Sequence, residues 1–200
     1  MGEQLDHEHD EGRLNVKYGM EFELRIYEVD PDYRWNWMQS IEHPLRFISL
    51  RDDRTFVCVN GAHTSTPSEV KKLTIRRLAP ASGSTITTAE ELNRILESPV
   101  LEIRQYKIKP GERARFTTFF HDRTLASQGQ YGMAVYGPFN DLDDENTLTW
   151  FRGFPDVVER DRRKNNFYQS ALWLNELQDE AFSMIDDYSN VLLVTPVVLP

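Results

Sequence analysis

Cysteine, positive charge and long apolar runs are all scarce in this chain. Cys58 is the only cysteine among 200 residues, which excludes an internal disulfide and a thiolate zinc cluster and agrees with the reducing cytoplasm. The longest apolar runs, such as Val191–Val194, fall far short of the ~20 residues that a membrane-spanning helix needs. With 23 Lys and Arg against 32 Asp and Glu, the net charge is −9. These scarcities predict a cytoplasmic protein whose main partner is neither nucleic acid nor a membrane.

Several catalytic and metal-binding motifs are also missing. The sequence has no Walker loop, no GxGxxG, no HExxH and no GxSxG, so no motif supports nucleotide-dependent or serine-hydrolase chemistry. Residues 141–145 have the spacing of a calcium loop, but Asn146 stands where glycine is needed and Arg152 where glutamate is needed. His7 and His9 form a pair on an acidic segment, which is too few ligands for a strong site. We therefore predict no metal and no cofactor.

Composition divides the chain into four segments. Residues 1–18 crowd acidic side chains without an apolar period, which predicts a disordered tail, and they resemble neither a secretory signal nor a mitochondrial transit peptide. Residues 81–99 begin with loop composition, and Thr88–Glu91 is a capping box that predicts a short helix reaching about Leu96. This segment is expected to link two folded units, residues 19–80 and residues 100–200.

An internal repeat is the strongest signal in the sequence. Residues 22–34 align with residues 101–113 at a constant offset of 79, and five of the thirteen columns are identical. Ordinary residue frequencies give about one identity by chance. The identical pairs are Glu23 and Glu102, Arg25 and Arg104, Tyr27 and Tyr106, Pro31 and Pro110, and Arg34 and Arg113. The repeat predicts two copies of one strand-and-helix unit.

The second copy shows the βαββαβ order of a ferredoxin-like unit. Alternation predicts a strand at 101–106, and Phe116, Phe119 and Phe120 give the following helix one aromatic face. Gly137-Pro138 is expected to form a turn. The complete expected order is a strand at 101–106, a helix at 113–128, strands at 131–136 and 147–154, a charged helix at 156–166, an amphipathic helix at 171–188 and a strand at 191–198.

The first copy, residues 19–80, is shorter and more degenerate. Its first strand is followed by Trp35, Met38 and Ile41, one helical stripe that Pro44 brings to an end. Strands are expected at 54–59 and 73–78, with little room between them for a long second helix.

The stretch Leu101–Gly111 resembles the opening of NIPSNAP-family domains, which begin Y-E-x-R-x-Y-x-(apolar)-x-P-G. The resemblance continues through the aromatic strand Thr149–Arg152, the charged helix around Glu159–Arg163 and a tryptophan-containing helix to a close near Leu193–Pro196. It covers about residues 100–198. Leu101 departs from the pattern because an aromatic residue is common there, and the first copy keeps only the opening.

This resemblance implies the dimeric α/β-barrel superfamily, in which two ferredoxin-like sheets face each other, usually between subunits. A tandem chain could supply both sheets, so we predict an α+β protein of tandem ferredoxin-like units, assembled either as a homodimer or as an internal pseudo-dimer. Relatives in the superfamily include cofactor-independent monooxygenases, heme-degrading enzymes, and aldoxime or chlorite enzymes. NIPSNAP domains themselves mostly lack an established reaction, so the fold does not give the function.

A polar trio occupies one face of the first strand in both copies. Glu102, Arg104 and Tyr106 point the same way, either into the barrel or towards the helices. The favoured interpretation is structural, with carboxylate, guanidinium and phenol satisfying one another in a partly dry space. The functional alternative is an anion or carbonyl site in which Arg104 clamps the ligand and Tyr106 donates a proton. The matching residues of the first copy are Glu23, Arg25 and Tyr27.

Other side chains could extend such a site. His121 would be the general base if there is one, although a lone histidine on a helix is more often exposed. Trp150 and Arg152 share a strand face and could stack a planar ligand or line the core. Tyr131 and Tyr136 lie on opposite strand faces, so at most one of them can join a given pocket.

Three functions remain open from the sequence. The favoured one is binding of a small apolar or aromatic molecule inside the α/β barrel. The second is a cofactor-independent monooxygenase acting on an aromatic or quinol substrate, and the third is a non-enzymatic scaffold with a filled barrel and a protein partner. The candidate catalytic residues are His121, Tyr106 and Arg104, and the candidate ligand-binding residues are Glu102, Trp150, Arg152, Tyr136, Arg25 and Tyr27.

Overall fold

The computed structural model describes residues 20–33, 45–59 and 69–197. The acidic tail with His7 and His9, and the helical stripe formed by Trp35, Met38 and Ile41, lie outside the described residues. Within them, no helix has both the length and the apolar character to cross a membrane.

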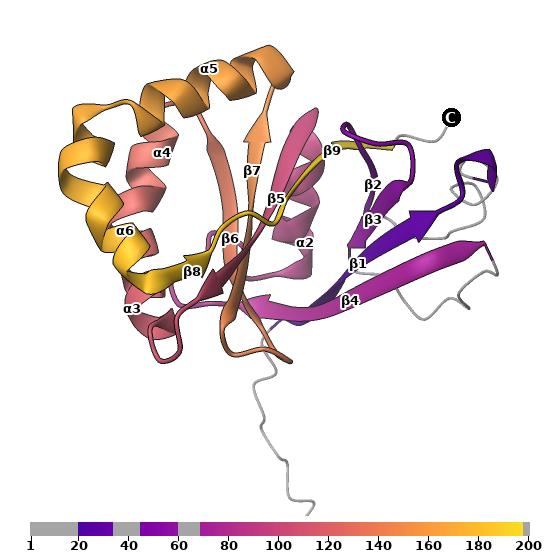
Figure 1. Ribbon diagram of the computed structural model, residues 1–200, viewed down its shortest axis with the longest axis horizontal. Helices are drawn as coiled ribbons and strands as arrows, with labels where there is room; N and C mark the ends of the chain where they lie inside the picture. The colour runs from indigo at the N-terminus through magenta and orange to yellow at the C-terminus, as the bar shows by residue number, and fades with distance from the viewer. Residues whose placement is uncertain (1–19, 34–44, 60–68, 198–200) are drawn as a thin grey trace, which may run out of the picture.

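A closed antiparallel barrel is the centre of the described structure (Figure 1). Its strands run in the order β7-β6-β4-β1-β3-β2-β9-β5, and pairing of β5 with β7 closes the ring, while the short β8 extends from the end of β5. The strands are β1 Phe22–Val29, β2 Leu45–Ser49, β3 Thr55–Val59, β4 Val70–Pro80, β5 Val100–Ile108, β6 Ala134–Asp141, β7 Thr147–Phe154, β8 Ile185–Asp187 and β9 Val191–Pro196.

The two halves of the chain contribute strands in the same spatial order. The first half runs β4-β1-β3-β2 and the second runs β9-β5-β7-β6, which in each half is the fourth, first, third and second barrel strand. The repeated motifs around Tyr27 and Tyr106 therefore lie on corresponding strands, β1 and β5. Two junctions join the halves, β2 with β9 and β4 with β6.

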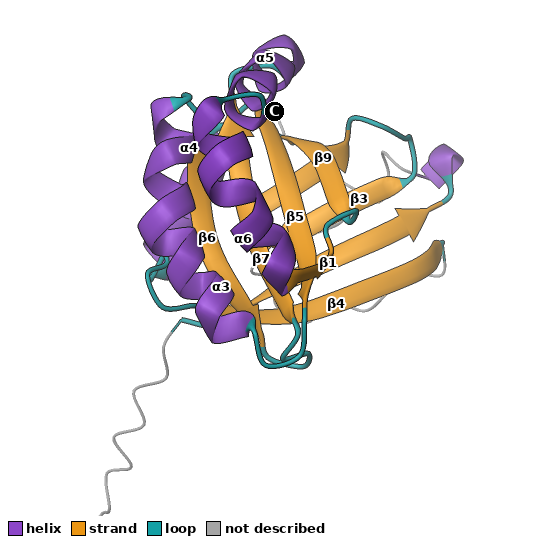
Figure 2. Ribbon diagram, turned by 60° about the vertical axis from the view of Figure 1, so that its left-hand side comes forward, coloured by secondary structure: helices purple, strands orange, loops and turns teal. Residues whose placement is uncertain are grey.

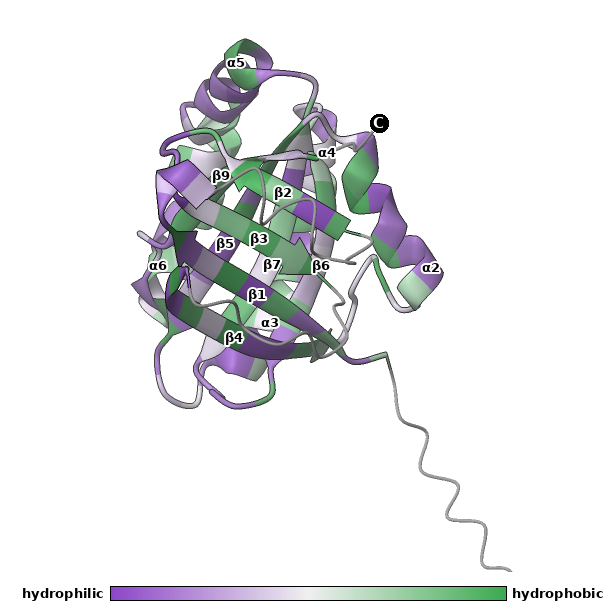
Figure 3. Cartoon of the chain, turned by 90° about the vertical axis from the view of Figure 1, so that its right-hand side faces the viewer, coloured by the Kyte–Doolittle hydropathy of each residue, from purple (hydrophilic) through white to green (hydrophobic). Residues whose placement is uncertain are grey.

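Apolar side chains fill the interior of the barrel. Alternate residues of the strands, visible as alternating hydropathy along β1 in Figure 3, point inward and form one buried cluster. Leu24, Phe47, Ile103 and Phe151 are fully buried in it. An eight-stranded barrel has an interior that side chains can fill, so the ligand-holding lumen expected from the sequence is occupied by core residues.

The helices cover the outer face of β5, β6 and β7, as Figure 2 shows. A second buried cluster, rich in aromatic residues, lies between these strands and the helices. The helical segments are α3 Arg113–Phe119, a π-helical turn Phe120–Leu125, α4 Ala126–Gln130, α5 Val157–Tyr168, a π-helical turn Trp173–Leu177 and α6 Gln178–Met184.

The linker carries the short helix that its capping box predicts. Helix α2, Ala89–Leu92, begins after Thr88, whose side chain accepts the Glu91 N–H at 3.2 Å, while the Glu91 carboxylate accepts the Thr88 N–H at 3.2 Å. A 3-10 helix, Asn93–Glu97, continues from it. Leu92 and Ile95 from these two segments are fully buried in the barrel cluster.

Several sequence expectations differ from the structure. The strand expected at 131–136 begins at Ala134 and continues to Asp141 as β6, so Tyr131 lies at the end of α4 and not on a strand face. Gly137-Pro138 is not a turn but an irregularity within β6, where the Pro138 and Gly137 carbonyls accept hydrogen bonds from Ala81 and Thr85 of the linker. The helix expected to reach residue 188 ends at Met184, because the next three residues pair with β5 as β8. Strand β2 was not predicted, since five residues directly after a proline give too short an alternation.

Candidate ligand-binding site

The polar trio of β5 lies beneath the helices of the second half. Leu101 and Ile103 point into the barrel, so Glu102, Arg104 and Tyr106 point to the outer face, and all three are buried. Arg104 Nη1 donates to Glu102 Oε2 at 2.8 Å, and Arg104 Nε donates to the Tyr106 hydroxyl at 3.1 Å. The trio therefore fits both interpretations, because its side chains satisfy one another and also form a buried polar group beneath the helices.

Glu102 is the centre of a buried ionic network. Its cross-strand partner Arg152 donates to Oε2 through Nε at 2.9 Å and Nη2 at 2.6 Å. From α5, Arg160 Nε donates to Oε1 at 2.7 Å, and Lys164 Nζ lies 3.2 Å from the same oxygen. Burial alone would raise the pKa of Glu102, but Arg152, Arg104, Lys164 and Arg160 outweigh it and hold that pKa well below the usual range.

Positive charge exceeds negative charge in this network. Four cations contact the single buried carboxylate of Glu102, and only Arg160 has a further carboxylate partner, the exposed Asp161 at 2.5 Å. Among the described residues, two positive charges are thus left without a counter-charge. Burial lowers the pKa of Lys164 more than Glu102 raises it, which is the response expected of an ammonium group in a crowded cationic site.

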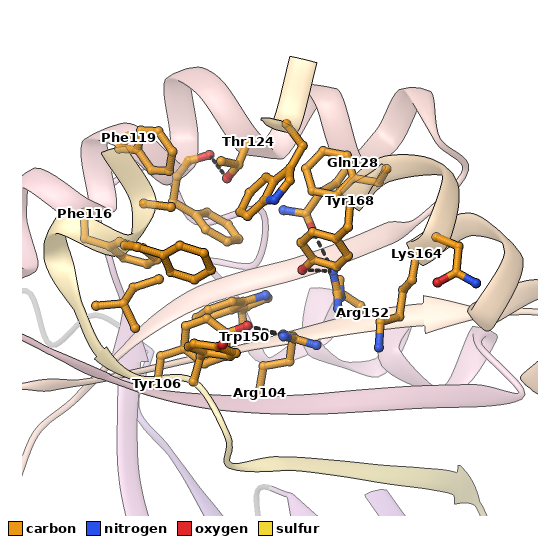
Figure 4. A pocket seen from close by; sticks show the side chains of 18 residues that line it. Arg104, Tyr106, Phe116, Phe119, Thr124, Gln128, Trp150, Arg152, Lys164 and Tyr168 are labelled. Carbon is orange, nitrogen blue, oxygen red and sulfur yellow. Dashed lines mark hydrogen bonds between the residues drawn. The ribbon is translucent and has the colours of Figure 1, made fainter. Parts of the chain in front are cut away.

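A cavity of about 390 Å³ opens between these strands and the helices. Figure 4 shows phenylalanine side chains at one end and charged side chains at the other. The aromatic lining includes Phe116, Phe119, Phe120, Trp150, Phe167 and Trp173. The polar lining includes Arg104, Tyr106, Gln128, Arg152, Lys164 and Tyr168.

Trp150 on β7 lies at the junction of the two ends. Its ring meets Tyr106 edge-on at 4.3 Å between centroids, and the Arg104 guanidinium carbon lies 5.9 Å from its ring centre. The side chain is 4% exposed, yet its Nε1–H has no hydrogen-bond partner among the described residues. A buried indole N–H usually has an acceptor, so this cavity offers an unused donor.

The pKa values of two phenols in the cavity, Tyr106 and Tyr168, are shifted in opposite directions. Burial raises the pKa of Tyr106, although its hydroxyl accepts from Arg104. The Tyr168 hydroxyl accepts from Arg152 Nη1 at 3.0 Å. Burial would raise the pKa of Tyr168 as well, but the charges of Arg152 and Arg104 lower it below the ordinary value. Of the two phenols, Tyr168 is therefore the one that gives up its proton more readily.

The structure brings together five of the predicted site residues. Arg104, Tyr106, Trp150 and Arg152 line the cavity, and Glu102 lies directly behind them and holds the two arginines in place.

His121 lies apart from this group. Its side chain is 52% exposed and its Nδ1 is 2.7 Å from Asp122 Oδ1. Phe120 and Thr124 of the same π-helical turn face the cavity, which leaves the imidazole on the outer side, against Gly83. His121 therefore does not line the cavity, and this geometry gives the general-base assignment no support.

Three predicted ligand-binding residues also lie elsewhere. Tyr136 belongs to the barrel cluster, with its hydroxyl 3.0 Å from that of Ser98. Arg25 and Tyr27 lie on the outer face of β1 in the other half, where Arg25 Nε donates to Glu23 at 2.6 Å. These residues do not contribute to the cavity lining.

Sequence reasoning missed three cavity or network residues on one helix. Arg160, Lys164 and Tyr168 follow one another at intervals of four along α5, so they share a face of that helix. From the sequence, this stretch was expected only to be a charged helix. The regular spacing of two cations and a phenol, opposite a strand carrying Glu102, was the signal available. No cluster of three or more histidine, cysteine or acidic side chains suited to a metal occurs in the described ranges.

Comparison with solved structures shows the fold. A "putative monooxygenase" from Lactobacillus acidophilus is 11% identical, with a TM-score of 0.59 over 90% of this chain and 99% of that one. A "putative chlorite dismutase" is 12% identical, with a TM-score of 0.54 over 90% and 96%. An uncharacterized NIPSNAP domain protein from Burkholderia xenovorans is 16% identical, covering 50% of this chain and 97% of its own, with a TM-score of 0.46.

The first two structures show that this chain has an α+β fold of the dimeric α/β-barrel type. No curated protein sequence matches the chain. The family model for NIPSNAP matches residues 101–198, the segment that contains β5, the ionic network and the whole cavity lining. The second half of the chain, residues 101–198, is therefore the part that matches the NIPSNAP family.

Proposed function

We propose that this protein binds a small aromatic molecule in the cavity between β5, β7 and the helices, outside the barrel interior. The observation that carries the proposal is the composition of a cavity of about 390 Å³, with aromatic walls and a few convergent polar groups. Ligand sites in proteins have this composition and reach ~300–1,000 Å³. Phe182 and Tyr188 line the same cavity and are partly exposed, which gives a ligand an apolar entrance.

We further propose that the two halves are tandem ferredoxin-like units that form an internal pseudo-dimer. The shared strand order and the repeat between residues 22–34 and 101–113 support this interpretation. Only the second half carries the described cavity, so the first half serves as its structural partner in the barrel. A cytoplasmic location and a further outer dimer remain predictions from the sequence.

A neutral fluorescent probe tests the binding proposal. N-phenyl-1-naphthylamine brightens when it leaves water, and we expect it to bind the wild type with 1:1 stoichiometry. Ala181→Phe places a ring into the cavity from α6 and should weaken binding at least tenfold. Ser183→Phe, on the exposed side of the same helix, is the matched control and should bind as the wild type does.

A second measurement uses the unaltered protein. The chain has four tryptophans, so a proton–nitrogen correlation spectrum shows four indole N–H signals, which Trp150→Phe and Trp173→Phe assign. The probe should shift the signals of Trp150 and Trp173, which line the cavity. Absence of these two shifts, or no saturable binding, would contradict the proposal and favour the non-enzymatic scaffold.

Monooxygenation of an aromatic quinol is a second candidate because of Tyr168. Once deprotonated, the Tyr168 phenolate can accept a proton from an acidic substrate, and the neighbouring Arg152 and Arg104 can stabilise the resulting anion. Reaction with dioxygen would then place one oxygen atom in the substrate and release the other as water, with the substrate supplying the electrons. Oxygen uptake across a quinol panel tests this: Tyr168→Phe should abolish any turnover, and His121→Ala should not change it.

A further inference from the structure

We infer that the natural ligand carries a carboxylate, which docks at the cavity end formed by Arg104, Lys164 and the Trp150 indole N–H. This inference rests on the proposed function and adds the chemical class of the ligand. It follows from three observations: an excess of buried positive charge, unused hydrogen-bond donors and the small number of those donors.

The excess of charge is the first observation. The side chains of Arg104, Arg152 and Arg160 are 7%, 1% and 9% exposed, and Glu102 is the one buried carboxylate that faces them. Burying unpaired positive charge is unfavourable, because water no longer solvates it. An anionic ligand would reduce this cost. The net charge of −9 over the whole chain makes a cationic cavity more unusual still, because general electrostatics would not bring anions to this protein.

The second observation is the set of donors left unused. Lys164 reaches Glu102 at 3.2 Å, and an ammonium has three N–H groups, so it can donate to a ligand as well. The Trp150 Nε1–H has no partner among the described residues and lies in the same wall as Arg104. In Figure 4, Lys164 and Arg104 extend from opposite walls towards the same end of the cavity.

The third observation decides between a carboxylate and a larger anion. Most guanidinium N–H groups of Arg104 and Arg152 already bind Glu102, Tyr106 and Tyr168. A phosphate would bring three acceptor oxygens and nearly two negative charges close to the Glu102 carboxylate. A planar carboxylate needs fewer donors and can lie flat between the aromatic walls, joined to an aromatic body that fills the remaining cavity.

Matched naphthalene derivatives test the inference by calorimetry. The probes are 2-naphthoate, its neutral isostere 2-naphthamide, and 2-naphthyl phosphate. We expect 2-naphthoate to bind the wild type at least tenfold more tightly than 2-naphthamide, a difference of about 1.4 kcal/mol. Lys164→Gln should remove most of this preference without weakening 2-naphthamide binding, and Lys164→Arg should restore it. Arg162→Gln, an exposed cation on the same helix that pairs with Glu159, should leave the preference intact.

The outcomes separate the two proposals. If 2-naphthoate and 2-naphthamide bind equally, the carboxylate inference is wrong and the aromatic site stands. Tighter binding of 2-naphthyl phosphate than of 2-naphthoate would also overturn the carboxylate, in favour of a phosphate ester. If neither 2-naphthoate nor 2-naphthamide binds, and neither one shifts the indole N–H signal of Trp150, the proposed function is wrong. The carboxylate inference is then wrong as well, because it rests on that function. The comparison of 2-naphthoate with 2-naphthamide uses the wild-type protein alone. It therefore tests the inference even if the Lys164→Gln variant does not fold.

Discussion

Replacing Glu102 by glutamine should destabilise the protein far more than a typical single change. The side chain is fully buried and accepts from, or pairs with, four cations at 2.6–3.2 Å. Glutamine keeps the shape but removes the charge, and its amide N–H groups would face guanidinium and ammonium N–H groups. Breaking a buried ion pair from one side costs ~3–5 kcal/mol, and we expect Glu102→Gln to reach that range.

The internal repeat supplies a matched control. Glu23 occupies the corresponding position on β1, but it is 32% exposed and pairs with Arg25 at 2.6 Å. Glu23 stays in contact with solvent and balances one guanidinium instead of four cations, so Glu23→Gln should cost less than Glu102→Gln even though Arg25 is only 4% exposed. Urea unfolding followed by circular dichroism measures the free energy of unfolding for wild type and both variants. Equal losses for Glu23→Gln and Glu102→Gln would refute the argument that Glu102 balances a concentration of buried charge.

Three further predictions follow from the same structure. The pKa of Glu102 in the folded protein lies well below the 4.5 of an ordinary glutamate, so its stabilising effect is complete above about pH 4.5 and declines as the pH falls towards the folded pKa. The difference in unfolding free energy between wild type and Glu102→Gln should therefore shrink between pH 6 and pH 3. A constant difference would contradict the assignment. Burial raises the pKa of Cys58 to about 12, so iodoacetamide at pH 8 should label it slowly in the native protein and rapidly in urea, as mass spectrometry would show; fast native labelling would count against its burial. Phe151→Ala should lower the free energy of unfolding by ~3–5 kcal/mol because Phe151 is fully buried in the barrel, whereas Val158→Ala, 76% exposed, should change it little; similar losses in urea titrations would mean that the barrel interior is not packed as described.

The strands of the second half were predicted well because apolar and polar residues alternate along them and turn-forming or capping residues mark where elements begin and end. The strand expected at 147–154 has the same bounds as β7, and the capping box at Thr88 forms as predicted. The repeat placed Tyr27 and Tyr106 on corresponding strands. These are local signals, which depend on residues within a few positions of one another.

The site was predicted only in part because its location depends on packing between distant segments. Both faces of β5 are buried, so alternation alone could not decide whether Glu102 or Ile103 points into the barrel. The apolar character of the barrel interior decides it, and that interior takes side chains from both halves. His121 and Phe120 are neighbours in sequence, and only the helix packing determines which of them faces the cavity.

Tethering changes how the barrel responds to dilution. In barrels of this fold that are built from two subunits, the contacts between the sheets are lost when the protein concentration falls below the dissociation constant. Here the junctions β2 with β9 and β4 with β6 join segments of one polypeptide, so their local concentration is set by the linker and not by the solution. The sheet that supports the cavity should thus stay intact at any dilution, and ligand affinity measured at nanomolar protein should equal that measured at micromolar protein.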